Sequence, residues 1–288
     1  MWVSSVGWWA ACKAPFTWAP DLPGLKGVYT VVEKEVLKWE YQLDGAGGAL
    51  LPAGTIWPYR LVTKAFASLL EKYGHRLNIE THSPVTSIAF DASNPSYPYV
   101  LHTPRGCLRA VKVAHCTNGH AGHLLPGLRG AVYPFKGTMT VQDAGSAFPN
   151  RGADLSWGSH YPVIYDNSRV GYFFFGGEDT QIKQLQDKLP TFLGHNRPAQ
   201  WRLVGGWSGI MGFSADGLPV VGRAKASMTG RQSEGEFLAV ASNGYGMANC
   251  LLAGEALAKI MLGEDVSAWL PTAYRIHETR LKELLTVD

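Results

Sequence analysis

The sequence predicts a mixed α/β fold in which several short strands and a few helices share a chain of 288 residues. Three observations predict it. An amphipathic helical pattern spans residues 57–74, β-branched alternation recurs between residues 85 and 116, and a strand–turn–helix unit begins at Phe237. With 46% apolar residues, the chain has enough hydrophobic side chains for one large core or two interleaved ones.

The first long helix is predicted to begin at Trp57 and to end at Gly74. Pro58 suits a first helical turn, apolar residues recur on one face, and Gly74 supplies a stop. Earlier in the chain, residues 35–43 predict a short helix or strand.

Short strands are expected to follow this helix, separated by turns rich in Pro and Asn. Residues 77–81, 85–90 and 99–103 alternate in β-branched residues, and residues 106–119 run into a strand expected to be buried, Val111–Cys116. Two more strands are predicted at residues 137–142 and 170–175, and a polar helix at residues 179–193.

The strand–turn–helix unit near the C-terminus is the most informative pattern. It consists of a strand, Phe237–Ala241, a turn, Asn243–Gly246, and a helix, Met247–Leu262. A glycine turn at a helix start leaves backbone N–H groups unpaired, and the helix dipole adds positive charge there, so an anionic or electron-rich ligand edge is favoured. Taken alone, the same pattern suits a tight turn that only allows close packing.

Composition excludes several function classes. A net charge of +3 without a clustered basic run argues against nucleic-acid binding, and no apolar stretch approaches the ~20 residues that cross a bilayer. The four cysteines are scattered, which indicates reduced thiols in a cytoplasmic protein. The spacing of His115, His120 and His123 fixes no common metal geometry, so no metal site is predicted.

A family resemblance rests on the C-terminal block. The segment W-S-G-I-M-G-F-S-A-D-G-L-P-V-V-G (207–222), followed by S-N-G-Y-G-M (242–247) and a helix rich in small residues, resembles the signature of the D-amino-acid-oxidase-like (DAO) FAD-dependent oxidoreductases, most closely the fungal members. Upstream, T-I-W-P-Y-R-L-V, V-T-S-I and Y-P-F-K-G-T-M resemble pieces of the same family in the same order.

The resemblance implies a single DAO-like unit over residues 1–288. An incomplete FAD/NAD(P)-binding three-layer domain would be interleaved with a mixed-sheet substrate domain. Its flavin-domain portions would be residues 58–75, 77–125 and 201–288, and its substrate-domain portions residues 20–57 and 126–200.

The function implied by the resemblance is oxidation of a C–N bond of a small-molecule amine or amino acid, with hydride transfer to FAD and O2 as acceptor. FAD is expected to be bound non-covalently, because no Cys occupies the segment 207–214. Met211 stands where family members that oxidise amino acids often carry Arg, which favours an amine or an acid held elsewhere, for example by Arg60 or Arg223. The oligomeric state stays open.

The resemblance also suggests site residues. The catalytic candidates are Lys136 and Tyr245. The cofactor-binding candidates are Val85, Thr117, Asn118, Gly119, Gly217, Asn243, Gly244, Tyr245, Gly246 and Met247. Plainer interpretations exist for each: a buried strand for Val85, an ordinary turn for Asn118–Gly119, and packing for the glycine turn. The aromatic residues Trp57, Tyr59, Tyr133 and Phe135 could line a substrate pocket, but such residues more often belong to a core.

A further departure from the family pattern concerns the loop that binds the ADP half of FAD. The ADP half of FAD sits on a G-x-G-x-x-G loop between a strand and a helix, and this sequence contains no such loop. The nearest cluster, Gly45–Gly48, is followed by A-L-L-P, which does not predict a helix. An alternative function is therefore that of a truncated, FAD-free pseudoenzyme or binding subunit of the same family.

Overall fold

The computed structural model describes residues 3–7, 30–40, 48–53, 57–143, 145, 156–158, 163–167, 172–178, 181–192, 201–231 and 234–285. The chain forms two compact units. Unit 1 comprises residues 1–57 and 136–209, and unit 2 comprises residues 58–135 and 210–288. The assignment of flavin and substrate functions to parts of the chain stays a prediction.

Unit 1 is built on one large sheet whose strand order is β12-β8-β11-β10-β9-β1-β3-β2. The strands are β1 (Val3–Gly7), β2 (Thr30–Val32), β3 (Gly48–Ala53), β8 (Val132–Asp143), β9 (Ser156–Gly158), β10 (Val163–Asn167), β11 (Tyr172–Glu178) and β12 (Arg202–Ser214). The unit also contains two helices, α1 (Lys34–Glu40) and α4 (Ile182–Phe192). The boundaries between the units fall within β8 and β12.

The predicted elements of this unit are present with shifted ends. Strand 137–142 lies within the longer β8, strand 170–175 corresponds to β11, and the polar helix corresponds to α4. The predicted residues 41–43, 45–47, 170, 171, 179, 180 and 193 lie outside the described residues. The helical alternative holds for the segment at residues 35–43, which contains most of α1.

The core of unit 1 lies between the sheet and α4. Strand β11 pairs antiparallel with β8, and its alternate residues Phe173 and Phe175 are fully buried. They are joined in the core by Leu185 and Leu189, which lie four residues apart on one face of α4. A period of two in the strand and of about 3.6 in the helix therefore brings these apolar side chains into one core.

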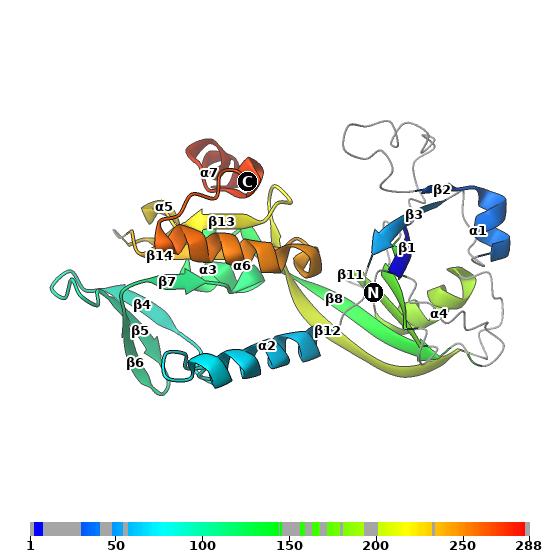
Figure 1. Cartoon of the computed structure of the whole chain (residues 1–288), viewed down its shortest axis with the longest axis horizontal. Helices are drawn as coiled ribbons and strands as arrows, with labels where there is room; N and C mark the ends of the chain where they lie inside the picture. Colours follow the sequence, from blue (N-terminus) through cyan, green and yellow to red (C-terminus); the bar gives the residue numbers. More distant parts are fainter. Residues whose placement is uncertain are drawn as a thin grey trace. The chain divides into compact units, whose positions relative to one another are not determined.

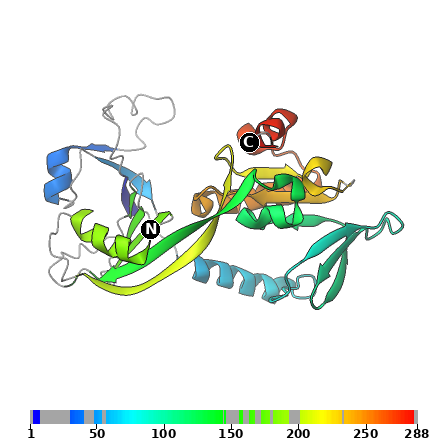
Figure 2. The ribbon, with the colours of Figure 1, turned by 180° about the vertical axis from the view of Figure 1, so that it is seen from behind.

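Unit 2 contains a three-layer arrangement around a small mixed sheet. Strand β14 (Glu236–Val240) pairs parallel with β7 (Val113–His115) and antiparallel with β13 (Val220–Arg223). Figures 1 and 2 show α6 (Gly246–Leu262) on one side of this sheet and α3 (Ala121–Leu124) on the other.

The alternation of strand residues explains the two helical layers. On one face, Val220, Leu238 and Val240 pack with Leu125, next to α3. On the other face, Val221 and Ala239 pack with Ala256 of α6. The small residue Ala256 of α6 is fully buried against this face of the sheet. The mixed α/β class is confirmed.

A separate antiparallel meander consists of β4 (Ser87–Phe90), β5 (Tyr99–Thr103) and β6 (Gly106–Ala110). The predicted strand at residues 77–81 is wrong, because these residues form no strand. Local polar bonds compete with a ladder there: Asn78 Nδ2 donates to Glu80 Oε1, and His82 adopts a positive φ of 54°. The expected buried strand 111–116 is shorter, since only Val113–His115 pair with β14.

The predicted helix at residues 57–74 is confirmed as α2 (Pro58–Tyr73). It ends where expected, just before Gly74, and a Cβ at this position would lie only 2.6 Å from the carbonyl oxygen of Leu70. The apolar face of α2 is not buried, however: none of its residues is buried among the described residues. Periodicity predicts the helix correctly but does not predict what covers it.

The remaining described elements of unit 2 are short. They are η2 (Asn118–His120), η3 (Pro126–Leu128), α5 (Ala226–Thr229), η5 (Thr272–Tyr274) and α7 (Glu278–Leu285). Helix α7 is anchored by Leu284, which is fully buried in the same cluster as Val220 and Leu238. None of the helices in the described ranges has the length and apolar character needed to span a membrane.

Candidate functional site

Two strand ends of unit 2 lie at the same edge of the sheet. Because β7 and β14 run parallel, with His115 opposite Leu238, the residues that follow both strands emerge side by side. Asn118 Oδ1 accepts a hydrogen bond of 3.0 Å from the backbone N–H of Ser242. The segments Thr117–Gly119 and Ala241–Met247 are thus joined at the strand edge where α/β sheets place their ligands.

The end of β12 forms the third side of this site. The backbone N–H of Asn243 donates to Gly212 O (2.8 Å), and the N–H of Ser214 donates to Asn243 Oδ1 (2.9 Å). Gly119 and Gly212 lie against each other: a Cβ on Gly119 would be 2.7 Å from Met211 O, and one on Gly212 would collide with Asn118 Oδ1. Close backbone approach explains both glycines. We call Asn118, Gly119, Gly212 and Asn243–Met247 the strand-end site.

The turn in this site has a strained backbone. Ala241 and Asn243 have φ values of 60° and 51°, and Gly244 has a φ of 78°. The left-handed conformation costs a non-glycine residue roughly 1–2 kcal/mol, so surrounding contacts must fix it. The Asn243 side chain makes two such contacts. Its Nδ2 donates to Ala241 O, and its Oδ1 accepts the backbone N–H of Ser214. The Asn243 side chain therefore holds the turn.

Several backbone N–H groups at the start of α6 have no hydrogen-bond acceptor among the described residues. Tyr245 N–H donates to Ser242 O, and the N–H groups of Ala248 and Asn249 donate to Tyr245 O. Within the described part of the chain, the N–H groups of Gly244, Gly246 and Met247 donate to no acceptor. Tyr245 and Met247 are exposed, so the start of this long helix is accessible. Helix dipole and free amides together favour an anionic or electron-rich group there.

Aromatic side chains border the same turn. Tyr133 stacks on Phe213 with ring centroids 6.1 Å apart, and Phe135 meets Phe213 edge-to-face at 5.6 Å. A Cβ on Gly244 would lie 3.9 Å from Phe213, so this group adjoins the turn. Phe213 was not among the residues singled out from the sequence. Trp57 and Tyr59 instead lie at the start of α2 and are exposed.

Not all predicted site residues meet here. Thr117 lies next to Asn118, and Gly217, with a φ of 71°, lies in the turn that links β12 to β13. Val85 packs on the small cluster of Ile88, Tyr99 and Val113, away from the helix start. Lys136 is exposed on β8 and belongs to unit 1.

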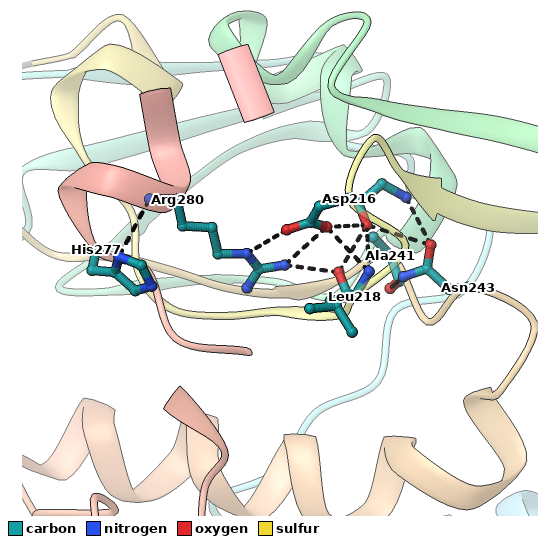
Figure 3. A network of polar contacts seen from close by, with 7 residues as sticks. Asp216, Leu218, Ala241, Asn243, His277 and Arg280 are labelled. Atoms are coloured by element: carbon teal, nitrogen blue, oxygen red, sulfur yellow. Dashed lines mark hydrogen bonds and ion pairs between the residues drawn. The ribbon is translucent and has the colours of Figure 1, made fainter. Parts of the chain in front are cut away.

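An ion pair that sequence reasoning missed lies behind the turn (Figure 3). Arg280 of α7 binds Asp216 through Nε (2.7 Å to Oδ2) and Nη2 (3.3 Å to Oδ1). Ser214 Oγ donates to the same carboxylate at 2.8 Å. Burial alone would raise the pKa of Asp216, but the hydrogen bonds from Arg280 and Ser214 outweigh it and hold the pKa below its ordinary value.

A second missed cluster lies in the core of the sheet. Glu236 is fully buried at the start of β14, where Arg231 donates to both of its carboxylate oxygens at 2.7 Å. His115 Nε2 lies 2.8 Å from Glu236 Oε2. Burial alone would raise the pKa of Glu236, but the hydrogen bonds from Arg231 and His115 outweigh burial and hold the pKa below its ordinary value. The carboxylate is therefore charged. No spacing rule in the sequence predicts that these residues meet.

Comparison with known proteins gives a family for the chain. The family model for FAD dependent oxidoreductases (DAO) matches residues 18–260. No curated protein shows significant sequence similarity to the chain.

Solved structures share the fold at low sequence identity. Glycine oxidase from Geobacillus kaustophilus superimposes with a TM-score of 0.70 at 20% identity, over 92% of this chain and 72% of that protein. L-Proline dehydrogenase from P. horikoshii gives 0.69 at 16% identity, over 92% and 74%. L-Amino acid deaminase from Proteus vulgaris gives 0.66 at 13% identity, over 95% and 72%. With the family match over most of its length, this chain belongs to the DAO family of FAD-dependent oxidoreductases.

Proposed function

We propose that the chain oxidises a C–N bond of an amine or amino acid with non-covalently bound FAD, and that the strand-end site takes the isoalloxazine. The observation that carries the proposal is the set of open N–H groups of Gly244, Gly246 and Met247 at the exposed start of α6. Such donors suit the N1–C2=O edge of a flavin, which becomes negative on reduction. When bound, FAD would supply the hydride acceptor, with O2 as its oxidant.

The chain's own residues would act by holding and orienting. Asn118 and Asn243 fix the backbone of the turn, so the open amides need no rearrangement to meet a ligand. Gly119 and Gly212 keep side chains out of the junction between the strand ends. The exposed phenol of Tyr245 lies within the site and is a candidate for substrate contact. Lys136, which follows Phe135 on β8, stays a candidate catalytic residue.

The substrate class is proposed from chemistry at the site. Met211 precedes Gly212 and cannot form the paired hydrogen bonds by which Arg clamps a carboxylate. Arg223 already binds Glu234 at 3.0 Å and lies over the ring of Phe237. These observations favour an amine, or an amino acid whose carboxylate is held elsewhere, for example by Arg60. The solved neighbours, a glycine oxidase, a proline dehydrogenase and an amino acid deaminase, support a small amine-bearing substrate.

Cofactor binding is the first test. Purified full-length chain should carry flavin absorbance, and added FAD should raise its melting temperature. A colourless protein that FAD does not stabilise would instead support an FAD-free binding subunit of the same family. The missing glycine-rich loop makes this outcome meaningful, because pyrophosphate contacts normally supply much of the affinity.

A glycine pair sharpens the test. Gly244→Ala adds a methyl at a φ of 78° beside the open amides, whereas Gly130→Ala adds one at a φ of 85° where no heavy atom lies within 4 Å. Both variants should lose about 1 kcal/mol of unfolding free energy, because alanine is strained at positive φ. Only Gly244→Ala should also weaken FAD binding, by roughly 1–2 kcal/mol in a titration. Equal weakening by both variants would contradict the placement of the flavin.

Substrate and acceptor are tested separately. Anaerobic mixing with simple primary and secondary amines, and with amino acids, should bleach the flavin fastest with amines. Admitting O2 should then restore the absorbance and produce hydrogen peroxide. Bleaching without restoration would keep the amine oxidation and reject O2 as the acceptor.

A further inference from the structure

We propose that Arg280, near the C-terminus, is a positioning residue for the Asn243–Met247 turn and acts through Asp216 and Ser214. The inference rests on the proposed function only where it calls this turn the flavin site. Arg280 lies beyond residues 18–260, the part of the chain matched by the family model. It is therefore a feature of this chain that the family match does not describe.

The first step is the fixation of Arg280 itself. Helix α7 is held to the core by Leu284, and its start is capped by His277, whose Nδ1 accepts the N–H of Arg280 (3.3 Å). The Arg280 residue is only 3% exposed, so its long side chain has little room to adopt other rotamers. Its Nη2 also donates to Leu218 O at 2.9 Å. The guanidinium thus binds both the Asp216 carboxylate and the backbone of the turn after β12.

The second step is the set of contacts that connects Asp216 and Leu218 to Asn243 in the strand-end site. Ser214 is the link, because its hydroxyl oxygen lies 2.8 Å from both Asp216 Oδ1 and Leu218 O, either of which can accept its single hydrogen, and it accepts the N–H of Leu218 at 3.0 Å. The backbone N–H of the same residue donates to Asn243 Oδ1. Figure 3 shows these contacts as one continuous network from α7 to Asn243. Loss of the guanidinium would leave the Asp216 carboxylate without its cation and Leu218 O without this donor, which would loosen the backbone of residues 214–218 that carries the N–H bound by Asn243 Oδ1.

The third step concerns the strain of the turn. Ala241 and Asn243 hold positive φ values that only their surroundings maintain. Asn243 depends on Ser214 for the partner of its Oδ1. If the Ser214 end of this contact loosens, the turn should relax toward ordinary backbone angles, and the open amides should lose their common direction. Arg280 is accordingly a positioning residue, since it contributes no atom to the site.

The experiment compares full-length wild type with Arg280→Gln, Arg280→Lys and the matched control Arg275→Gln. Arg275 lies five residues earlier and binds Thr272 Oγ1 (2.6 Å) rather than Asp216. Hydrogen exchange of the peptide covering residues 242–249 is measured without FAD, so this readout does not depend on flavin binding. Exchange there should accelerate about tenfold in Arg280→Gln, partly recover in Arg280→Lys, and stay unchanged in Arg275→Gln.

A double-mutant cycle tests the proposed route. If Arg280 acts through Ser214, then Ser214→Ala should accelerate the same peptide, and the double variant should exchange no faster than the faster single variant. FAD affinity should fall about tenfold in Arg280→Gln and not in Arg275→Gln. Multiplicative effects in the cycle, or equal exchange in Arg280→Gln and wild type, would overturn the inference. Should Arg280→Gln not fold, Arg280→Lys and Ser214→Ala decide it by the same exchange readout.

The two proposals fail in different ways. If wild type does not bind FAD but the exchange pattern holds, the proposed function is rejected while Arg280 still positions the turn. If wild type binds FAD and Arg280→Gln changes neither exchange nor affinity, the positioning role is rejected alone.

Discussion

Two arginine–carboxylate pairs in unit 2 use the same chemistry at different depths in the fold. Arg231 and Glu236 lie five residues apart, and His115 adds a third partner from β7. Arg280 and Asp216 lie 64 residues apart and meet behind the turn of the strand-end site. The shortest contact in each pair is 2.7 Å, yet Glu236 is fully buried whereas the Asp216 side chain is 23% exposed.

The difference in burial and connection assigns different tasks to the two pairs. The Glu236 cluster joins β14 to β7 inside the sheet, so it supports the frame from which both strand ends emerge. The Asp216 pair joins the last helix to one turn, so it supports the local geometry of the site. We therefore expect changes at Glu236 to lower global stability most, and changes at Asp216 to cost less stability but more site order.

The largest effect is expected for Glu236→Gln. The change leaves the charged Arg231, whose side chain is 15% exposed, without its buried carboxylate, and breaking such a pair typically costs about 3–5 kcal/mol. The free energy of unfolding from denaturant titration measures it. Glu234→Gln is the control, because Glu234 pairs with Arg223 at a side-chain exposure of 88% and should change stability by less than about 1 kcal/mol. Similar losses in both variants would refute the distinction.

A smaller effect is expected for Asp216→Asn. Hydrogen bonds to a charged group contribute about 1.5–3 kcal/mol, and the amide retains part of them, so the loss of unfolding free energy should be about 1–2 kcal/mol. The loss should depend on pH. The pKa of Asp216 in the folded chain is lowered, so its stabilisation is fully present above the unfolded value of about 3.9 and disappears as the pH falls through the folded pKa.

Stability curves for wild type and Asp216→Asn should therefore converge below about pH 4 and run parallel between pH 5 and 7. Glu236 has a lowered pKa for the same kind of reason, so Glu236→Gln should also approach wild type in acid. If the difference in unfolding free energy between wild type and Asp216→Asn stayed constant as the pH fell below about 4, the charge of Asp216 would contribute nothing to stability.

The smallest effect is expected at an exposed pair of the same kind. Arg105 Nη1 binds Glu80 at 2.7 Å, but the two side chains are 62% and 54% exposed. Arg105→Gln should lower the free energy of unfolding less than Asp216→Asn does, because solvent screens exposed pairs. Added salt should reduce even this loss when unfolding is followed at increasing ionic strength. A loss as large as that of Asp216→Asn would mean that burial does not rank these pairs.

Local patterns predict many of the elements but fewer of the contacts. The helix stop at Gly74 and the turn before α6 follow from residue chemistry within a few positions, so their existence can be read from the sequence. The strand expected at residues 77–81 fails because local side-chain bonds compete with the ladder. The apolar residues of α2 lie on one face as their periodicity predicts, but this face is exposed. Periodicity therefore predicts the face of a helix and does not predict which element packs against it.

Some residues of the site can be predicted from local sequence patterns, and others cannot. Gly244, Gly246 and Met247 could be identified because a glycine turn at a helix start has a local signature. Phe213, Asp216 and Arg280 could not be given their places, since each acts through a partner distant in the sequence and a single Arg or Phe carries no spacing signal. Their positions depend on where β12 ends and where α7 packs.

By itself, the sequence determined the three longest helices, part of the strands, the family resemblance and the glycine turn, because each depends on the chemistry of neighbouring residues. Only the tertiary structure decided that Asn118, Gly212 and Asn243 meet at one sheet edge, and that Arg280 and Glu236 bind the partners they do. The physical reason is that parallel pairing and burial bring together atoms from distant segments, and no local pattern encodes that meeting.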